Sequence, residues 1–455
     1  MMIFDYTYHR NLSHLHVGCD APRAYFIPYK SDEGAEKGNR AASYYFRSLC
    51  GRWNFRFYRR CEEIGDFCSD SFDNVYSDSI DVPRSWQTVL GAGYDIPQYT
   101  NYIYPIPIDP PHVPEDNPCG LYHRSLVLGE NELDGHDVKI VFEGVDSCFY
   151  LFVNNEFAAY SQVSHMTSEI DITKYVHPGE NDLKVVVVKW SDGTYLEDQD
   201  KLRFSGIFRE VYLLFREKIR IEDVHVSNTL SDDFSTGKIN AEIFANAKAD
   251  INYRLVDPRG NVLEAGTVCC DRHGCLELKV GSPVLWNDET PNLYELYLSC
   301  GSEHIRLEIG MRRVEIKGKV VLVNGKKVKA KGMNRHDSHP LLGAATPYEH
   351  MLRDLYIMKA HNINMVRTSH YPNDPRFLEL CDRLGFYVCD EADIESHGMN
   401  EIGRWNWLTD SPEWTAAFMD RVDRMVARDR NHSCVIMWSL GNENGYGNNQ
   451  LLMYK

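Results

Sequence analysis

The sequence is poor in positive charge. Lysine and arginine together number 49, aspartate and glutamate number 66, and the formal net charge is −17. Because a surface of that sign repels phosphate backbones, we expect no nucleic-acid partner. With 43% hydrophobic and 25% charged residues the chain is too apolar to be disordered, and 455 residues suffice for about three domains.

Long apolar runs are also missing. The longest obvious one, Val185–Val188, is much shorter than the roughly 18 residues of a membrane-spanning helix. The N-terminal region lacks the apolar stretch of a secretory signal. We therefore expect a cytoplasmic protein with no membrane partner.

Paired cysteine motifs are absent. The 13 cysteines are odd in number and form no C-x-x-C pair, so the sequence predicts neither a disulfide framework nor a zinc ribbon. One cluster, Cys269, Cys270, His273 and Cys275, offers ligands for a soft metal, but its spacing fits no common zinc site. We interpret it as a polar turn.

Two consecutive regions have the short alternating segments of antiparallel sandwiches. The first runs from about Tyr44 to Phe215 and includes a hairpin turning at Asn154-Asn155. Its proline-rich stretch, 105–118, is predicted to be a long ordered loop because proline has no N–H for a strand ladder. The second region, about Glu217 to Val314, suits a small immunoglobulin-like sandwich. Its candidate strands are 238–244, 251–256, 276–280, 293–298 and 305–309.

After Val314 the period changes to β-α-β-α-β-α-β. The candidate strands are 328–333, 364–367, 386–389 and 435–438, and the helices are 349–361, 375–384 and one capped by Ser411. This alternation predicts a parallel sheet covered by helices, either a (β/α)8 barrel or an open doubly wound sheet. No G-x-G-x-x-G follows a strand, which disfavours dinucleotide binding.

Polar side chains follow all four predicted strands, in the segments 334–337, 367–371, 390–397 and 441–444. Barrel active sites collect at these strand ends, so we expect an active site there. Glu395 and His397 point to the same side if extended, and with Glu443 they suit a hard cation such as Mg²⁺. A carboxylate–imidazole hydrogen bond without metal is an equal alternative.

Glu443 is also a candidate general acid for glycoside hydrolysis. That chemistry usually needs a second carboxylate, and the partner is not obvious. Asp390 and Glu391 are available, although either fits equally well as a strand-end residue paired to Arg367.

Several motifs resemble the large bacterial β-galactosidases of glycoside hydrolase family 2. They are the segments 190–200, 332–337, 369–372, 390–398 and 438–443, supported by 82–87, 99–101 and 144–147. The likeness extends over most of the chain from about Leu49. Related β-glucuronidases and β-mannosidases look similar around Asn442-Glu443.

The resemblance implies a retaining exo-β-galactosidase acting on terminal β-D-galactose of lactose-type substrates, homo-oligomeric as the full enzyme. Glu443 is then the acid/base, and Glu395, His397 and Glu443 hold Mg²⁺. The implied substrate-binding residues are Asn101, Asp192, His336, His370 and Asn442. Asp192 is also implied to lie near a monovalent cation, usually Na⁺.

The resemblance also implies three domains and a missing part. It divides the chain into an N-terminal segment with a jelly-roll sugar-binding sandwich (1–216), an immunoglobulin-like sandwich (217–314) and strands one to four of a TIM barrel (315–455). A complete barrel takes roughly 250 residues, and the family's nucleophile is a glutamate on a later strand. We therefore expect an N-terminal piece of a longer enzyme, without the nucleophile. The alternatives are a galactoside-binding module without turnover, a chain that complements a separate C-terminal half, and a related β-glycosidase of family 2.

Overall fold

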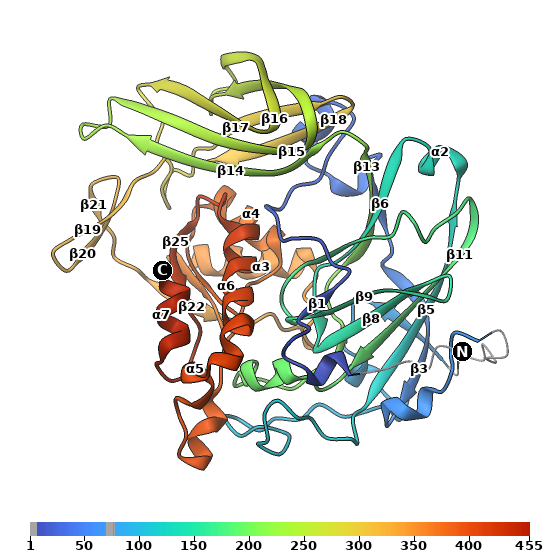
Figure 1. Cartoon of the computed structure of the whole chain (residues 1–455). Coiled ribbons are helices and arrows are strands. Elements are labelled where there is room, and N and C mark those ends of the chain that lie inside the picture. Colours follow the sequence, from blue (N-terminus) through green and yellow to red (C-terminus); the bar gives the residue numbers. More distant parts are fainter. Residues whose placement is uncertain (1–6, 70–75, 77) are drawn as a thin grey trace.

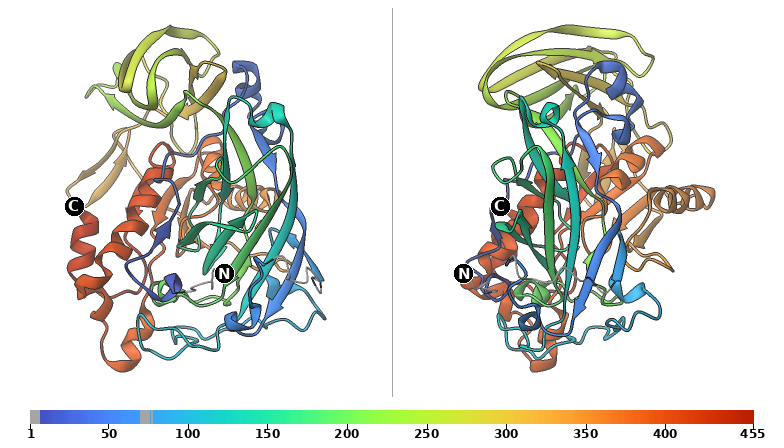
Figure 2. Two further views of the ribbon diagram at one scale, coloured as in Figure 1. Left: turned by 45° about the vertical axis from the view of Figure 1, so that its right-hand side comes forward. Right: turned by 90° about the vertical axis from the view of Figure 1, so that its right-hand side faces the viewer.

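The computed structural model describes residues 7–69, 76 and 78–455. They form two β domains and an α/β segment (Figure 1). The second β domain lies at one end of the molecule, against the other two parts, in both further views (Figure 2). It is joined to the α/β segment by hydrogen bonds such as Val226 N–H to Asn431 Oδ1, at 2.8 Å.

The first domain is the predicted antiparallel sandwich. A seven-stranded sheet has the order β1-β9-β8-β11-β5-β3-β4, a four-stranded sheet has the order β10-β6-β13-β2, and β7 pairs with β12. The bounds are β1 His16–Val17, β2 Phe46–Ser48, β3 Gly51–Tyr58, β4 Asp78–Val82, β5 Cys119–Leu128, β6 His136–Phe142, β7 Val145–Asp146, β8 Cys148–Val153, β9 Glu156–Gln162, β10 Ser168–Asp171, β11 Gly179–Val188, β12 Gly206–Ile207 and β13 Val211–Glu217. Two short helices, α1 Asp32–Lys37 and α2 Glu130–Leu133, accompany these strands.

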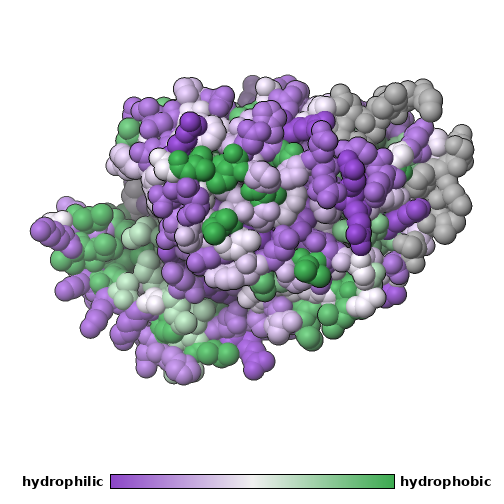
Figure 3. All heavy atoms as spheres, turned by 90° about the horizontal axis from the view of Figure 1, so that it is seen from below, coloured by the Kyte–Doolittle hydropathy of each residue, from purple (hydrophilic) through white to green (hydrophobic). Residues whose placement is uncertain are grey.

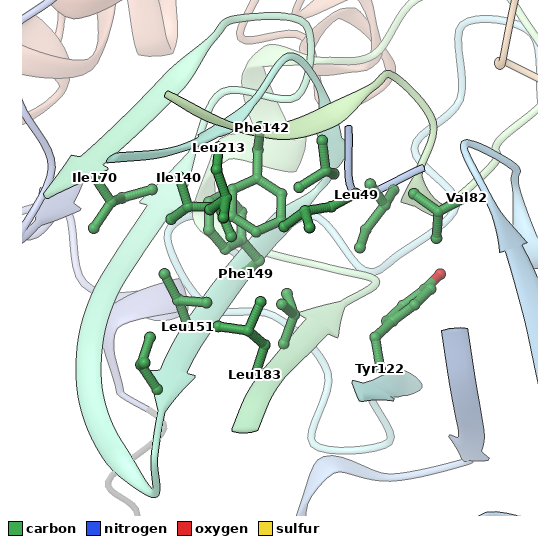
Figure 4. Packing of buried hydrophobic residues seen from close by; sticks show 14 of the residues in the cluster. Leu49, Val82, Tyr122, Ile140, Phe142, Phe149, Leu151, Ile170, Leu183 and Leu213 are labelled. Carbon is green, nitrogen blue, oxygen red and sulfur yellow. The ribbon is translucent and has the colours of Figure 1, made fainter. Parts of the chain in front are cut away.

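Apolar side chains from the two large sheets meet in one core. Figure 4 shows Ile140, Phe142 and Leu213 of the smaller sheet facing Phe149 and Leu151 of the larger one, all buried. The predicted hairpin is confirmed as β8 and β9, and its turn residues Asn154 and Asn155 have positive φ values of 51° and 65°. The segment 105–118 forms no helix or strand, as predicted.

The second β domain differs from its prediction in two places. Its strands are β14 Ile221–Leu230, β15 Thr236–Val256, β16 Val262–Gly281, β17 Tyr294–Cys300 and β18 Glu303–Ile309. The two strands predicted at 238–244 and 251–256 are one continuous strand, β15. No glycine or proline interrupts 245–250, and an irregular register between Phe244 and Lys248 absorbs the bend without ending the pairing.

The predicted polar turn at Cys269–Cys275 is wrong as well, because these residues lie within β16. Cys270 is buried and Cys275 exposed, in keeping with strand alternation. Arg272, with a φ of 64°, lies opposite the irregular register of β15. A bulge, not a turn, therefore accounts for the polar residues.

The α/β segment has the predicted order of elements. Its bounds are β22 Gly332–Arg335, α3 Tyr348–Ala360, β23 Met365–Thr368, α4 Pro375–Leu384, β24 Tyr387–Glu391, α5 Trp407–Asp410, α6 Thr415–Asp429, β25 Val435–Ser439 and α7 Asn448–Tyr454. The four strands are parallel and adjacent in chain order, β22-β23-β24-β25. Doubly wound sheets reverse their strand order at a switch point, and this sheet does not. The arrangement therefore favours the barrel alternative.

Two boundaries of this segment also need correction. The first strand begins at Gly332, not at Val328, because its pairing with β23 starts there. A small sheet precedes it, with β19 Val314–Lys317, β20 Val320–Val323 and β21 Lys326–Lys327. Ser411 opens a 3-10 turn, Pro412–Trp414, and α6 follows from Thr415.

The sandwich and the α/β segment share a buried contact. Tyr104 and Tyr195 of the sandwich domain pack in one apolar cluster with Ile394, Trp414 and Phe418. The face seen from below is mostly hydrophilic, with hydrophobic residues in separate small groups (Figure 3). No helix in the described ranges combines the length and apolar character needed to cross a bilayer.

Candidate active site

The residues predicted from the strand ends converge at one edge of the sheet. His336 follows β22, His370 follows β23 and Glu391 ends β24. Beyond β25, Asn442 pairs in parallel with Glu395, and Glu395 pairs in the same way with Glu197 of the sandwich domain. We call this edge, formed by the residues that follow β22 to β25, the rim. The sandwich domain reaches the rim directly through Glu197.

Glu395, His397 and Glu443 form a tight group. One ligand atom from each lies within 4.8 Å of the others, and His397 Nδ1 is 2.9 Å from Glu443 Oε2. The rings of Tyr102 and Trp405 lie 4.9 Å and 5.1 Å from that of His397. The geometry fits both alternatives drawn from the sequence, a cation site and a direct carboxylate–imidazole hydrogen bond.

Glu443 also has an unusual backbone. Its φ is 38°, in the region that glycine favours, and its side chain is 48% exposed at the rim. A non-glycine residue held there is strained by about 1–3 kcal/mol, and such strain clusters at functional sites. The side chain is thus presented to solvent by a conformation that the surrounding structure imposes.

Glu395 supplies the buried side of the group. Its Oε1 is buried and has no hydrogen-bond partner among the described residues, while Oε2 accepts from Asn442 Nδ2 at 3.0 Å. Burial, with contributions from Asp198 and Glu443, raises the pKa of Glu395 to about 8. A hard cation bound here would give the unpartnered Glu395 oxygen a partner, and the His397 nitrogen and a Glu443 oxygen lie close enough to bind the same ion. The residues therefore fit Mg²⁺.

Glu391 has the opposite surroundings. It is fully buried and accepts hydrogen bonds from Arg367, His370 and Ser439, at distances of 2.6 to 3.0 Å. Burial opposes ionisation, but these donors outweigh it and lower the pKa of Glu391. Of the two alternatives for this residue, the structure therefore supports the paired strand-end carboxylate.

Asn442, His370 and His336 are held at the rim by neighbours. Asn442 Oδ1 accepts from Arg367 Nη2 at 2.9 Å, so both ends of its amide are engaged. His370 is fixed by Glu391, and His336 Nδ1 lies 3.3 Å from the Tyr371 hydroxyl oxygen. The His336 and His370 rings meet edge to face at 5.4 Å.

The two sandwich residues implied by the resemblance have different positions. Asn101 is exposed and lies next to Tyr102, at the rim. Asp192 is fully buried within the sandwich domain, where burial raises its pKa to about 7 and Gly193, Gln162 and Arg421 surround its carboxylate. Both carboxylate oxygens of Asp192 lack a hydrogen-bond partner among the described residues. The roles that the resemblance implies for Asp192, at the sugar and at a monovalent cation, stay predictions.

The sequence did not single out Asp200 and Lys201 as site residues. Asp200 is exposed and acts electrostatically on His336, as does Lys201. Both belong to the segment 190–200 or adjoin it, but sequence alone does not tell which of its carboxylates faces the rim. Asp198 accepts from the Gly398 N–H at 2.8 Å, beside His397, and Asp200 acts on His336.

A second group with metal-ligand donors lies away from the rim. Asp382 accepts from His432 Nδ1 at 2.6 Å and from the Cys434 N–H at 2.7 Å. These bonds use both carboxylate oxygens. The group therefore serves as a buried junction between α4 and β25.

A sandwich domain packed on parallel strands with polar rim residues is an architecture of glycosidases. Family profiles match residues 46–217 ("Glycosyl hydrolases family 2, sugar binding domain"), 219–312 ("Glycosyl hydrolases family 2") and 314–455 ("Glycosyl hydrolases family 2, TIM barrel domain"). The chain belongs to glycosyl hydrolase family 2.

Curated relatives extend the match. The β-galactosidase of Actinobacillus pleuropneumoniae is 41% identical over 471 residues, covering 97% of this chain and 46% of that protein. The β-galactosidase of Staphylococcus xylosus is 39% identical, covering 98% of this chain and 44% of that protein. The chain spans a little under half the length of these relatives.

Solved structures agree in fold. A Bifidobacterium dentium β-glucuronidase has a TM-score of 0.72 at 19% identity, covering 87% of this chain and 68% of that chain. A Ruminococcus gnavus β-glucuronidase has a TM-score of 0.71 at 23% identity, covering 87% and 67%. At these identities the likeness concerns the fold alone.

Proposed function

We propose that this chain is the N-terminal part of a retaining exo-β-galactosidase that releases terminal β-D-galactose from lactose-type substrates. The observation that carries the proposal is the convergence of Glu395, His397 and a strained, exposed Glu443 at the rim. The named relatives at about 40% identity support the choice of sugar. The family resemblance suggests a homo-oligomer for the complete enzyme, and the lack of an apolar signal stretch in the N-terminal region suggests the cytoplasm.

Glu443 is the proposed acid/base. In the first step it donates a proton to the leaving oxygen, and in the second it removes one from water. His397 holds one of its oxygens, which leaves the other for the substrate. Retaining hydrolysis needs a second carboxylate about 5–5.5 Å away. Glu391 is fully occupied by its donors, so we assign that role to the second half of the barrel.

The other rim residues would bind and orient the sugar. Asn442, fixed at both ends of its amide, is proposed to contact the 2-hydroxyl, and His336 and His370 other hydroxyls. Asn101 would approach from the sandwich domain. Asp192, which is buried, stays a proposed contact of the sugar by the family resemblance alone.

Glu395, His397 and Glu443 are the residues that would hold Mg²⁺. When bound, the ion would supply positive charge that keeps the Glu395 carboxylate ionised and the group ordered. A monovalent cation, usually Na⁺, is proposed to lie near Asp192, whose two buried carboxylate oxygens have no hydrogen-bond partner among the described residues.

A second candidate is that the chain acts by complementing a separate C-terminal half. The observation that favours it is the open sheet, in which β22 and β25 each have one neighbour in the described part of the chain. An enzyme assembled from this chain and a family C-terminal half tests both candidates.

The decisive variant is Glu443→Gln in that assembled enzyme. Loss of general acid assistance should lower the rate by about 10²–10⁴ for galactosides with poor leaving groups. Activated aryl galactosides should lose less in the glycosylation step, measured by pre-steady-state kinetics. Equal losses for both substrate types would remove Glu443 from the acid role. Glu413→Gln, on the outer side of the segment, is the matched control.

A further inference from the structure

A buried tyrosine lies beneath one of the rim histidines. Tyr371 follows β23 and is fully buried, and its hydroxyl oxygen is 3.3 Å from His336 Nδ1. His336 Nε2 has no hydrogen-bond partner in the part of the chain that the structure describes.

Accounting for protons fixes the direction of the His336 bond. The contact with His336 Nδ1 is the one hydrogen bond that the Tyr371 hydroxyl makes within the described part of the chain. The Tyr371 O–H is buried and needs an acceptor of its own, and His336 Nδ1 is the acceptor within reach. A neutral imidazole that accepts at Nδ1 carries its proton on Nε2.

The sandwich domain clamps the Tyr371 ring. The His165 ring stacks on it with centroids 3.6 Å apart and planes 12° apart, and Lys201 Nζ lies 4.2 Å from its centroid. Lys201 Nζ is also 2.9 Å from His165 Nε2. Asp393 anchors His165 at Nδ1, at 2.8 Å. Since these residues come from the sandwich and from beyond β24, the ring has little freedom to move.

We infer that Tyr371 is a positioning residue that holds His336 as the Nε2–H tautomer, and that Lys201 and His165 of the sandwich domain hold Tyr371 in place. The inference rests on the proposed function for one consequence: His336 then presents an N–H donor to a sugar oxygen at the rim. A histidine free to change tautomer would present either a donor or an acceptor. Tyr371, held in place by Lys201 and His165, leaves only the Nε2–H tautomer of His336.

The charges around His336 favour its neutral form. Burial is the largest cause, and Lys201 and His370 add to it, so the pKa of His336 falls to about 4. Asp337 and Asp200 act in the opposite direction but do not outweigh them. Across neutral pH the ring therefore stays uncharged, which is the condition for a defined tautomer.

The tautomer can be measured directly in the ligand-free chain. With ¹⁵N-labelled histidine, two-bond ¹H–¹⁵N correlations distinguish a protonated from an unprotonated ring nitrogen, and His336→Gln assigns the signals. At pH 7 we expect an unprotonated Nδ1 and a protonated Nε2. A proton on Nδ1, or a charged ring, would overturn the inference without any further variant.

Two variants separate the contributions. Tyr371→Phe keeps the ring and its stack but removes the hydroxyl, so His336 should become a mixture of tautomers. Tyr297→Phe in β17 removes a hydroxyl far from the rim and should change nothing. Lys201→Met should raise the pKa of His336, while Lys201→Arg should leave it low. A single tautomer in Tyr371→Phe, or an unchanged pKa in Lys201→Met, contradicts the role assigned to that residue.

A binding measurement separates this inference from the proposed function. Tyr371→Phe should weaken binding of a non-hydrolysable thiogalactoside about fivefold, the loss of one oriented hydrogen bond. If the enzyme assembled with a C-terminal half binds no thiogalactoside but shows the expected tautomer, the proposed function fails and the positioning stands. Normal thiogalactoside binding with the proton on Nδ1 contradicts the positioning alone.

Discussion

At the scale of single residues, neighbours decide what each rim carboxylate does. Glu391 accepts hydrogen bonds from three side chains and holds them in place. Glu395 is buried and has one oxygen without a partner among the described residues. Glu443 is exposed and strained. Three glutamates within one sheet edge therefore have three different properties, although their sequence contexts are similar.

The metal assignment predicts a loss of Mg²⁺ binding in His397→Ala. One of three protein ligands disappears, so the dissociation constant measured by calorimetry should rise by about tenfold or more. His350→Ala, a histidine of α3 outside the group, is the control and should bind as the parent does. Equal Mg²⁺ affinity in the parent and in His397→Ala would place the ion elsewhere.

A pH-dependent stability is expected at the junction of α4 and β25. Burial alone would lower the pKa of His432, but Asp382 outweighs it and raises the pKa to about 8. The stabilisation, about 2 kcal/mol, should be complete below pH 6.5 and vanish as the pH rises through 8. The Cys434 N–H donates to Asp382. Its hydrogen-exchange rate, corrected for the intrinsic pH dependence of exchange, measures this stabilisation. A profile identical in parent and His432→Gln would exclude the mechanism.

The rim residues could be predicted because a strand end places its next residues at a known edge. The burial of Asp192 and the exposure of Asp200 could not be predicted in this way. Both are carboxylates in one loop, and only the packing of that loop on Arg421 and Ile394 decides which is enclosed. The clamp on Tyr371 was equally hidden, since it joins residues from three segments distant in sequence.

At the scale of elements, the residues that mark the ends of helices and strands explain which bounds were predicted correctly and which were not. The bounds of α4 were predicted correctly because Asp374 caps its start, Pro375 opens it and Gly385 ends it with a φ of 74°. The long strand β15 was missed because the ten-residue spacing of its apolar positions is the same for one bent strand as for two short ones. A bulge has no comparable marker in the sequence.

Gly385→Ala is predicted to destabilise the chain by more than a helix-ending glycine usually does. The added Cβ would meet the Asp288 carbonyl oxygen at 2.5 Å, in addition to the cost of a positive φ. We expect a total of about 2–3 kcal/mol, measured by urea denaturation. Gly38→Ala is the matched control, because Gly38 also ends a helix with positive φ but its Cβ meets only Arg306 Nη1, at 3.9 Å. It should cost about 1 kcal/mol, and equal losses would refute the clash.

At the scale of the whole molecule, the sheet of the α/β segment is open. β22 and β25 each pair on one side only within the described residues, whereas a closed barrel leaves no edges. Met437 and Trp438 of β25 are partly exposed, and so are Leu451, Leu452 and Tyr454 of α7. The two β domains, in contrast, have their own closed cores.

We therefore predict that residues 1–455, expressed alone, show no galactosidase turnover and self-associate through the α/β segment. Glu443 can protonate a leaving group, but Glu391 is held by three donors and the expected nucleophile belongs to the second half of the barrel, and protonation alone does not complete the reaction. Unpaired strand edges with adjacent apolar side chains recruit other chains. The measurements are o-nitrophenyl galactoside hydrolysis and light scattering, each with and without a separately expressed C-terminal half. Residues 1–314 are the control for association and should stay monodisperse. Turnover by the 455-residue chain that Glu443→Gln abolishes would mean that a carboxylate within it, such as Glu391, acts as nucleophile.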